Sequence, residues 1–82
     1  MNVRVRLFAR AKDLAGKDDV TISLAPGATI GDLRGRLAKE YPALAQILER
    51  CALAVNDEFA DDASTVPGNS EIAVLPPVSG GS

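Results

Sequence analysis

Residues 30–41 form the longest stretch of this chain with a helical period, and they set the frame for the rest of the fold. Thr29 before the stretch and Asp32 in its first turn have the spacing of a capping box, and Pro42 cannot continue a helix beyond Tyr41. The apolar side chains fall on one face: Ile30, Leu33, Leu37 and Tyr41. We therefore predict a helix with one buried face, which other elements must cover.

The other face of this helix is charged, and a second helical segment follows it. Arg34, Arg36, Lys39 and Glu40 are expected to lie largely on this charged face. Residues 43–50 predict a short second helix, whose apolar side is formed by Leu44, Ile47 and Leu48.

Alternating apolar and polar residues predict strands on both sides of the helix. In the first, Val3, Val5 and Leu7 alternate with Arg4, Arg6 and Phe8. The strands are expected at residues 3–8, 20–24, 51–55, 58–60 and 71–75. The first two should form a hairpin, and residues 9–18 between them are predicted as a loop with no more than one helical turn. The 58–60 strand is short and belongs at an edge of the sheet.

This order of elements favours an α+β fold of the β-grasp, or ubiquitin-like, type. We expect a mixed sheet of four to five strands packed on one main helix. By analogy with that fold, the first and last strands should be parallel neighbours at the centre of the sheet. Residues 1–77 are predicted to form one domain, and residues 78–82 a flexible C-terminal tail.

The composition excludes most kinds of independent active site. The chain has 82 residues, which is too short for two domains, and it contains no histidine. It therefore lacks the commonest general base and metal ligand, and no metal site is expected. Cys51 is the only cysteine, so neither an internal disulfide nor a four-cysteine iron–sulfur ferredoxin can form. Because Cys51 begins an apolar strand, we expect it to be packed and inert.

Charge and hydropathy narrow the classes of partner. The net charge is −2 and the pI is near 4.9, which disfavours binding to nucleic acid. No signal peptide or membrane-spanning run is expected, so no membrane partner is predicted. A single unpaired thiol suits a reducing compartment, and we expect a cytoplasmic protein.

The C-terminal residues carry the main functional feature. After the last strand, Pro76-Pro77 stiffens the chain. Gly80 and Gly81 follow shortly afterwards, and neither carries a side chain. One reading is a frayed terminus or a cloning remnant. The other is a terminal carboxylate on a slim segment that threads a narrow channel of a partner enzyme. Its position directly after the last strand of a β-grasp pattern favours the second reading.

An apolar patch is predicted beside this tail. Alternation places Phe8 on the outward face of the first strand and Leu75 on the outward face of the last. If these strands are parallel neighbours, the two side chains meet at one end of the sheet, and Phe59 extends the patch. Unless loops or Pro76-Pro77 cover it, such a patch indicates a surface for a partner.

Four short segments are together specific enough to suggest a family. They are Leu7-Phe8-Ala9-Arg10 followed by Asp13-Leu14-Ala15-Gly16, then Val55-Asn56, and finally Leu75-Pro76-Pro77-Val78-Ser79-Gly80-Gly81. Together they resemble the small subunits of molybdopterin synthase, in the ubiquitin-like sulfur-carrier family. The resemblance extends along essentially the whole chain.

The resemblance implies a role in molybdenum cofactor biosynthesis. An adenylyltransferase related to ubiquitin-activating enzymes would use ATP to activate the carboxylate of Gly81, which then becomes a thiocarboxylate. The tail, with Gly80 as its slim neighbour, would enter the large synthase subunit and give sulfur to cyclic pyranopterin monophosphate, forming the dithiolene of molybdopterin. The implied assembly is a heterotetramer of two small and two large subunits. Phe8, Phe59 and Leu75 would contact partners, and the chain itself would bind no cofactor.

Ser82 departs from the family pattern, because it holds Gly81 in a peptide bond. It is removed before activation, or it is an artefact, or the chain is not a carrier in this form. The alternatives are thus a β-grasp carrier for another product, such as thiamin thiazole, a thiolated tRNA or an amino acid, and an interaction module with an inert tail. Whether the chain counts as an enzyme is left open, since the catalytic groups would lie on the large subunit. The sulfur donor, the choice of molybdenum or tungsten, and the oligomeric state of the isolated chain also stay open.

Overall fold

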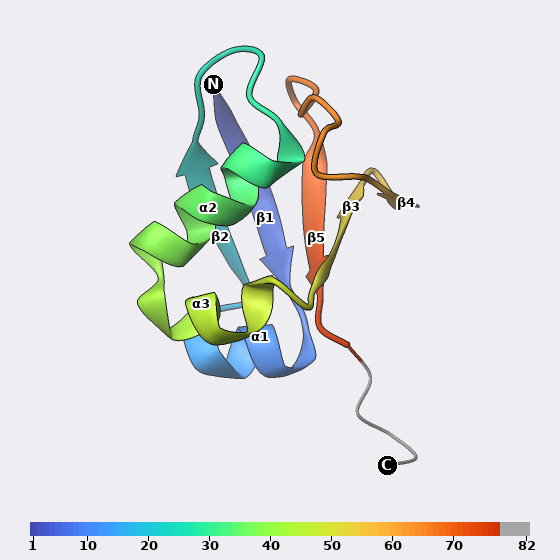
Figure 1. Cartoon of the computed structure of the whole chain (residues 1–82). Helices are drawn as coiled ribbons and strands as arrows, with labels where there is room; N and C mark the ends of the chain where they lie inside the picture. The colour runs from blue at the N-terminus through green and yellow to red at the C-terminus, as the bar shows by residue number, and fades with distance from the viewer. Residues whose placement is uncertain (78–82) are drawn as a thin grey trace.

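The computed structural model describes residues 1–77, so the predicted tail with Gly80, Gly81 and Ser82 lies outside the described residues (Figure 1). The helices are α1 (Ala9–Ala15), α2 (Ile30–Glu40) and α3 (Pro42–Leu48). The strands are β1 (Asn2–Leu7), β2 (Asp19–Ser23), β3 (Ala52–Val55), β4 (Glu58–Phe59) and β5 (Glu71–Leu75). The predicted strands and the main helix are therefore confirmed, within a residue or two at their ends.

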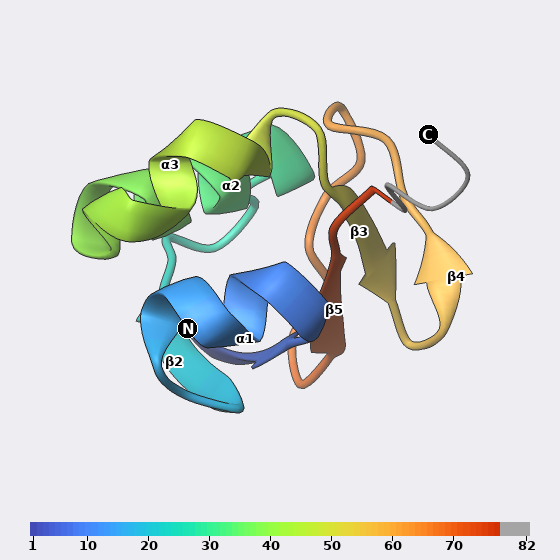
Figure 2. The same ribbon diagram turned by 90° about the horizontal axis from the view of Figure 1, so that it is seen from below.

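The strands form one mixed sheet in the order β2-β1-β5-β3-β4. β1 is parallel to β5, with Val5 opposite Ile72, while the other neighbouring pairs are antiparallel. The expected pairing of the first and last strands is thus confirmed. Figure 2 shows α2 and α3 together on one side of this sheet, which is the arrangement of a β-grasp fold.

Helix α2 begins at a complete capping box. The Thr29 hydroxyl accepts a hydrogen bond from the Asp32 amide at 3.2 Å, and the Asp32 carboxylate accepts one from the Thr29 amide at 2.9 Å. The next two amides, of Ile30 and Gly31, donate to carbonyls of the β4–β5 connection. On the inner face, Ile30, Leu33 and Leu37 are fully buried against the sheet. The helix is therefore held at its start and along its apolar face.

Helix α1 corrects the prediction of a loop over residues 9–18. It has two turns rather than one at most, and it ends at Gly16, whose φ of 72° is left-handed. Its N-cap, Phe8, makes no capping hydrogen bond with its side chain, so the usual start signal is missing from the sequence. Tertiary packing of the buried Ala11 and the half-buried Leu14 holds the helix in place.

Helix α3 follows α2 after one residue. Tyr41 is the C-cap of α2, where it is half-buried, and Pro42 occupies the first turn of α3, where a missing N–H costs nothing. Leu44 and Leu48 are buried, as expected from the pattern. Cys51 is also buried, and its thiol donates to the carbonyl oxygen of Ile47 at 3.3 Å.

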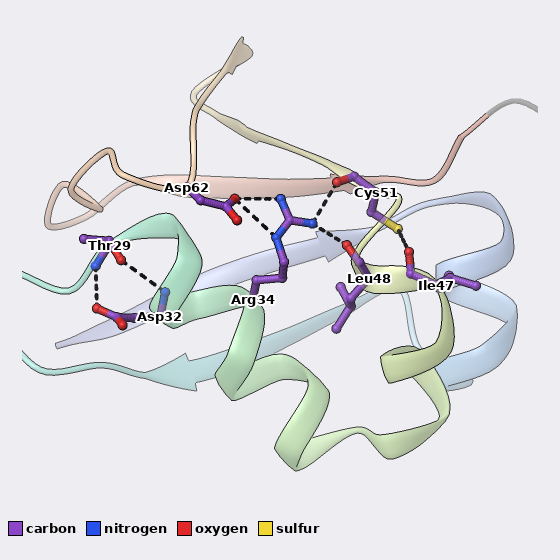
Figure 3. A network of polar contacts seen from close by, with 7 residues as sticks. All are labelled: Thr29, Asp32, Arg34, Ile47, Leu48, Cys51 and Asp62. Atoms are coloured by element: carbon purple, nitrogen blue, oxygen red, sulfur yellow. Dashed lines mark hydrogen bonds and ion pairs between the residues drawn. The ribbon is translucent and has the colours of Figure 1, made fainter.

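Arg34 lies on the charged face of α2 but is largely withdrawn from solvent. Its side chain is only 19% exposed, and its guanidinium donates to the carbonyl oxygens of Leu48 and Cys51 and to the carboxylate of Asp62 (Figure 3). One side chain thus links α2 to the end of α3, to the start of β3, and to the β4–β5 connection. A helical wheel cannot foresee this, because the acceptors are backbone groups placed by the tertiary fold.

Candidate functional site

The outer face of the sheet, opposite α2 and α3, divides into a charged half and an apolar half. On β1, Arg4 and Arg6 point outward and are exposed. Across the sheet from Arg6, the register aligns Ala73, Ala54 and Phe59 in one row. In the next outward row, Leu75 lies opposite Ala52.

We call the apolar half the docking face, and define it by Phe8, Ala52, Ala54, Phe59, Ala73 and Leu75. At its centre Ala52 is exposed, Ala73 is half-buried and Ala54 is buried at 4% exposure, and the larger side chains lie around them. Phe59 on the edge strand is 77% exposed, and Leu75 is half-buried. A cluster of this kind is available to a partner, since no helix of residues 1–77 lies on this side of the sheet (Figure 2).

Phe8 lies one residue beyond β1 and keeps the outward direction expected from alternation. It is 37% exposed, and the guanidinium carbon of Arg6 lies 5.4 Å from the centroid of its ring. After Phe8 the chain turns sharply at Ala9, which has a φ of 50°, an uncommon value for alanine. This turn leads the backbone into α1 and leaves the Phe8 ring beside Arg6.

Phe8 and Leu75 lie at the end of the sheet where β5 gives way to Pro76-Pro77. The last paired positions of the parallel strands are Leu7 and Val74, and Phe8 and Leu75 each come one residue later. Both strands finish at the lower end of the view in Figure 1, next to α1. The structure therefore places Phe8 and Leu75 beside the start of the Pro76-Pro77 segment, whereas Phe59 lies on β4, separated from β5 by β3. The role of these residues in binding stays a prediction.

A hollow of about 310 Å³ adjoins Phe8, lined by Arg6, Leu7, Phe8, Ala9, Lys12 and Asp18. The Lys12 ammonium lies 2.9 Å from the Asp18 carboxylate. This contact lowers the pKa of the Asp18 carboxyl and raises the pKa of Lys12. Those two charges therefore neutralise each other within the hollow.

Arg6 is the residue of this region that sequence reasoning missed as a functional group. Its nearest ion-pair partner among the described residues is the carboxylate of Glu71, at 3.5 Å. The sequence did offer a signal, because alternation places Arg6 and Phe8 on one face, but their stacking depends on the turn at Ala9.

The described residues carry little that resembles catalytic apparatus. Within residues 1–77, no group of three or more His, Cys, Asp or Glu side chains is placed to hold a metal ion. Burial raises the pKa of the Cys51 thiol, although nearby Arg34 opposes the shift, so this thiol is a poor nucleophile. In the same part of the chain, no helix is long and apolar enough to cross a membrane.

Comparison with known proteins places this geometry in context. A family model described as the ThiS family matches residues 5–81. A relative from Arabidopsis thaliana, named molybdopterin synthase sulfur carrier subunit, is 35% identical over 99% of this chain and 84% of its own length.

Solved structures agree with these matches. The crystal structure of SAMP1 from Haloferax volcanii is similar with a TM-score of 0.88 and 28% identity, over 99% of this chain and 100% of that one. A chain in the complex of subunits 1 and 2 of molybdopterin-converting factor from Helicobacter pylori has a TM-score of 0.70 and 29% identity. That match covers 99% of this chain and 100% of the other.

Proposed function

Because the chain belongs to the ThiS family, we propose that it is the sulfur-carrier small subunit of a molybdopterin synthase. The observation that carries the proposal is the extent of the match. The family model reaches residue 81, and the Arabidopsis thaliana sulfur carrier subunit aligns with 99% of the chain. The described fold supports it, because the central strand β5 is the last strand of residues 1–77 and precedes Gly80-Gly81 in the sequence.

In the proposed reaction, the carboxylate of Gly81 is the group that carries sulfur. A carboxylate oxygen is a poor leaving group, so a partner adenylyltransferase first converts it with ATP to an acyl-adenylate. Sulfur from a donor then displaces AMP and leaves a thiocarboxylate. Gly81 has to carry a free carboxylate for this chemistry, which requires that Ser82 be absent at the time of activation.

The second partner is the large synthase subunit, which supplies the catalytic groups. The likeness to a chain in the Helicobacter pylori complex of subunits 1 and 2 supports such a partner. We propose that the docking face binds it through Phe8, Phe59 and Leu75, and that two carriers and two large subunits form a heterotetramer. The thiocarboxylate then gives its sulfur to cyclic pyranopterin monophosphate, and two such transfers form the dithiolene.

The carrier itself is proposed to bind no cofactor, and the ATP belongs to the activating partner. A cytoplasmic location is proposed because the one cysteine is unpaired and buried, as suits a reducing compartment.

Reconstitution tests the proposal. The full chain and a variant that ends at Gly81 are each incubated with the activating enzyme, ATP and a sulfur donor, and intact mass is measured. We expect only the variant that ends at Gly81 to gain about 16 Da, because one carboxylate oxygen is replaced by sulfur. Addition of the large subunit and cyclic pyranopterin monophosphate should then yield molybdopterin.

Two outcomes would contradict the proposal. Equal thiocarboxylate formation by the full chain, with Ser82 still attached by mass, would contradict the requirement for a free Gly81 carboxylate. A thiocarboxylated carrier that gives no molybdopterin, but supplies sulfur to thiazole or tRNA synthesis, would assign the chain to another pathway. The matched control is a chain that ends at Gly81 with Gly80→Val, which should be activated or inserted poorly because of its bulk.

A further inference from the structure

We propose that Arg6 strengthens the binding of this carrier to the large subunit, by pairing with a carboxylate that the partner presents where it covers Phe8. The inference rests on the proposed function, since it names the same partner and the same docking face. It adds a charged contact at a defined position to a surface otherwise described by its apolar residues.

The first step is the position of Arg6 at the boundary of the two halves of the outer face. Its guanidinium stacks on the Phe8 ring at 5.4 Å, and its row of the sheet continues into Ala73 and Ala54. A partner that covers Phe8 must therefore also cover part of Arg6, whose side chain is 50% exposed in the free chain.

The second step is the weak pairing of Arg6 within its own chain. Its closest carboxylate, Glu71, lies at 3.5 Å, and Glu71 is itself 51% exposed. The other carboxylates near this end are already engaged. Asp19 accepts two hydrogen bonds from Arg4, the shorter at 2.7 Å, and the Asp18 carboxylate lies against Lys12.

The third step is the effect of removing water. A guanidinium that loses its hydration without gaining acceptors weakens association, whereas a carboxylate matches its planar fork with two parallel hydrogen bonds. The hollow of about 310 Å³ beside Phe8 gives a partner side chain room to approach Arg6. Charge complementarity at this point therefore calls for an aspartate or a glutamate on the partner.

The test compares Arg6→Leu, Arg6→Lys and the matched control Arg4→Leu, which removes an outward arginine of the same strand away from Phe8. Binding to the large subunit is measured by calorimetry at about 50 mM and about 300 mM salt. Arg6→Leu should bind at least about tenfold more weakly at low salt and should lose most of the salt dependence. Arg6→Lys should keep the salt dependence with a smaller loss, and Arg4→Leu should bind within about twofold of the unaltered chain. Thermal melts of each variant verify that the fold is intact.

The alternative makes the opposite prediction for Arg6→Leu. If the partner offers no carboxylate, leucine removes a guanidinium that would be desolvated without a partner, and binding stays equal or becomes tighter. That result would overturn the inference and leave the proposed function untouched. If the unaltered chain itself does not bind the large subunit, both the inference and the proposed partner are wrong.

Discussion

Substitution of Arg34 by methionine should destabilise this domain more than any other change to its charged surface. Methionine keeps most of the aliphatic stem but removes the donors to Leu48, Cys51 and Asp62 (Figure 3). A hydrogen bond to a charged group contributes about 1.5–3 kcal/mol. The two carbonyl contacts are partly buried, and Leu48 keeps a second donor in the Cys51 amide, so we use the lower value for both. Asp62 is 58% exposed, and its ion pair adds less than about 1 kcal/mol.

The expected loss is therefore about 3 kcal/mol, a large share of the roughly 4–12 kcal/mol of a domain this size. Urea unfolding followed by circular dichroism measures it, and the midpoint should fall by about 2 M or more. Arg36→Met is the matched control, because Arg36 lies on the same helix, is 48% exposed and pairs only with Glu40 among the described residues. It should cost about 0.5 kcal/mol or less. Equal midpoints for the two variants would refute the role that we assign to Arg34.

Three further changes test the core, the docking face and the thiol. Leu37→Ala should cost about 2–5 kcal/mol, because Leu37 is fully buried; an unchanged melting temperature would show that the helix face is assigned wrongly. Phe8→Ala should melt near the unaltered chain yet bind the large subunit at least about tenfold more weakly by calorimetry, since Phe8 is a partly exposed aromatic anchor. If Phe8→Ala unfolds while its folded fraction binds normally, Phe8 belongs to the core. Cys51 should react with iodoacetamide at least about tenfold faster in urea than in the native state, because burial raises the pKa of its thiol. The raised pKa also means that this thiol stabilises the fold below its unfolded pKa, and that the contribution is lost as pH rises through the folded pKa. Equal alkylation rates in the two states would contradict its burial.

Much of the sheet and its main helix followed from periodicity. Val3, Val5 and Leu7 alternate with exposed polar residues because one side of β1 packs on the core. This alternation can be recognised directly in the sequence. The start of α2 could also be predicted from sequence, since the capping box depends only on Thr29 and Asp32. In these cases the residues that carry the signal also make the contact.

The missed features depend on groups that are distant in sequence. Helix α1 is short and lacks a capping side chain, so its stability comes from packing rather than from its own residues. The contacts of Arg34 were not predicted, because two of its acceptors are the backbone carbonyl groups of Leu48 and Cys51, which any residue would provide. The outward direction of Phe8 was predictable from alternation, but the Arg6 guanidinium above its ring was not, because the turn at Ala9 sets that geometry.

The parallel pairing of β1 with β5 has a consequence for how the protein is made. β1 is synthesised before the other strands, whereas β5, its neighbour at the centre of the sheet, is synthesised after all of them. Until β5 is synthesised, β1 and β3 have no strand between them, and the core lacks the side chains of Ile72 and Val74. Pairing over so large a separation is slow compared with local contacts. Gly81 follows β5 in the sequence, so the strand that closes the sheet and the residue proposed to carry sulfur are both synthesised after the rest of the fold.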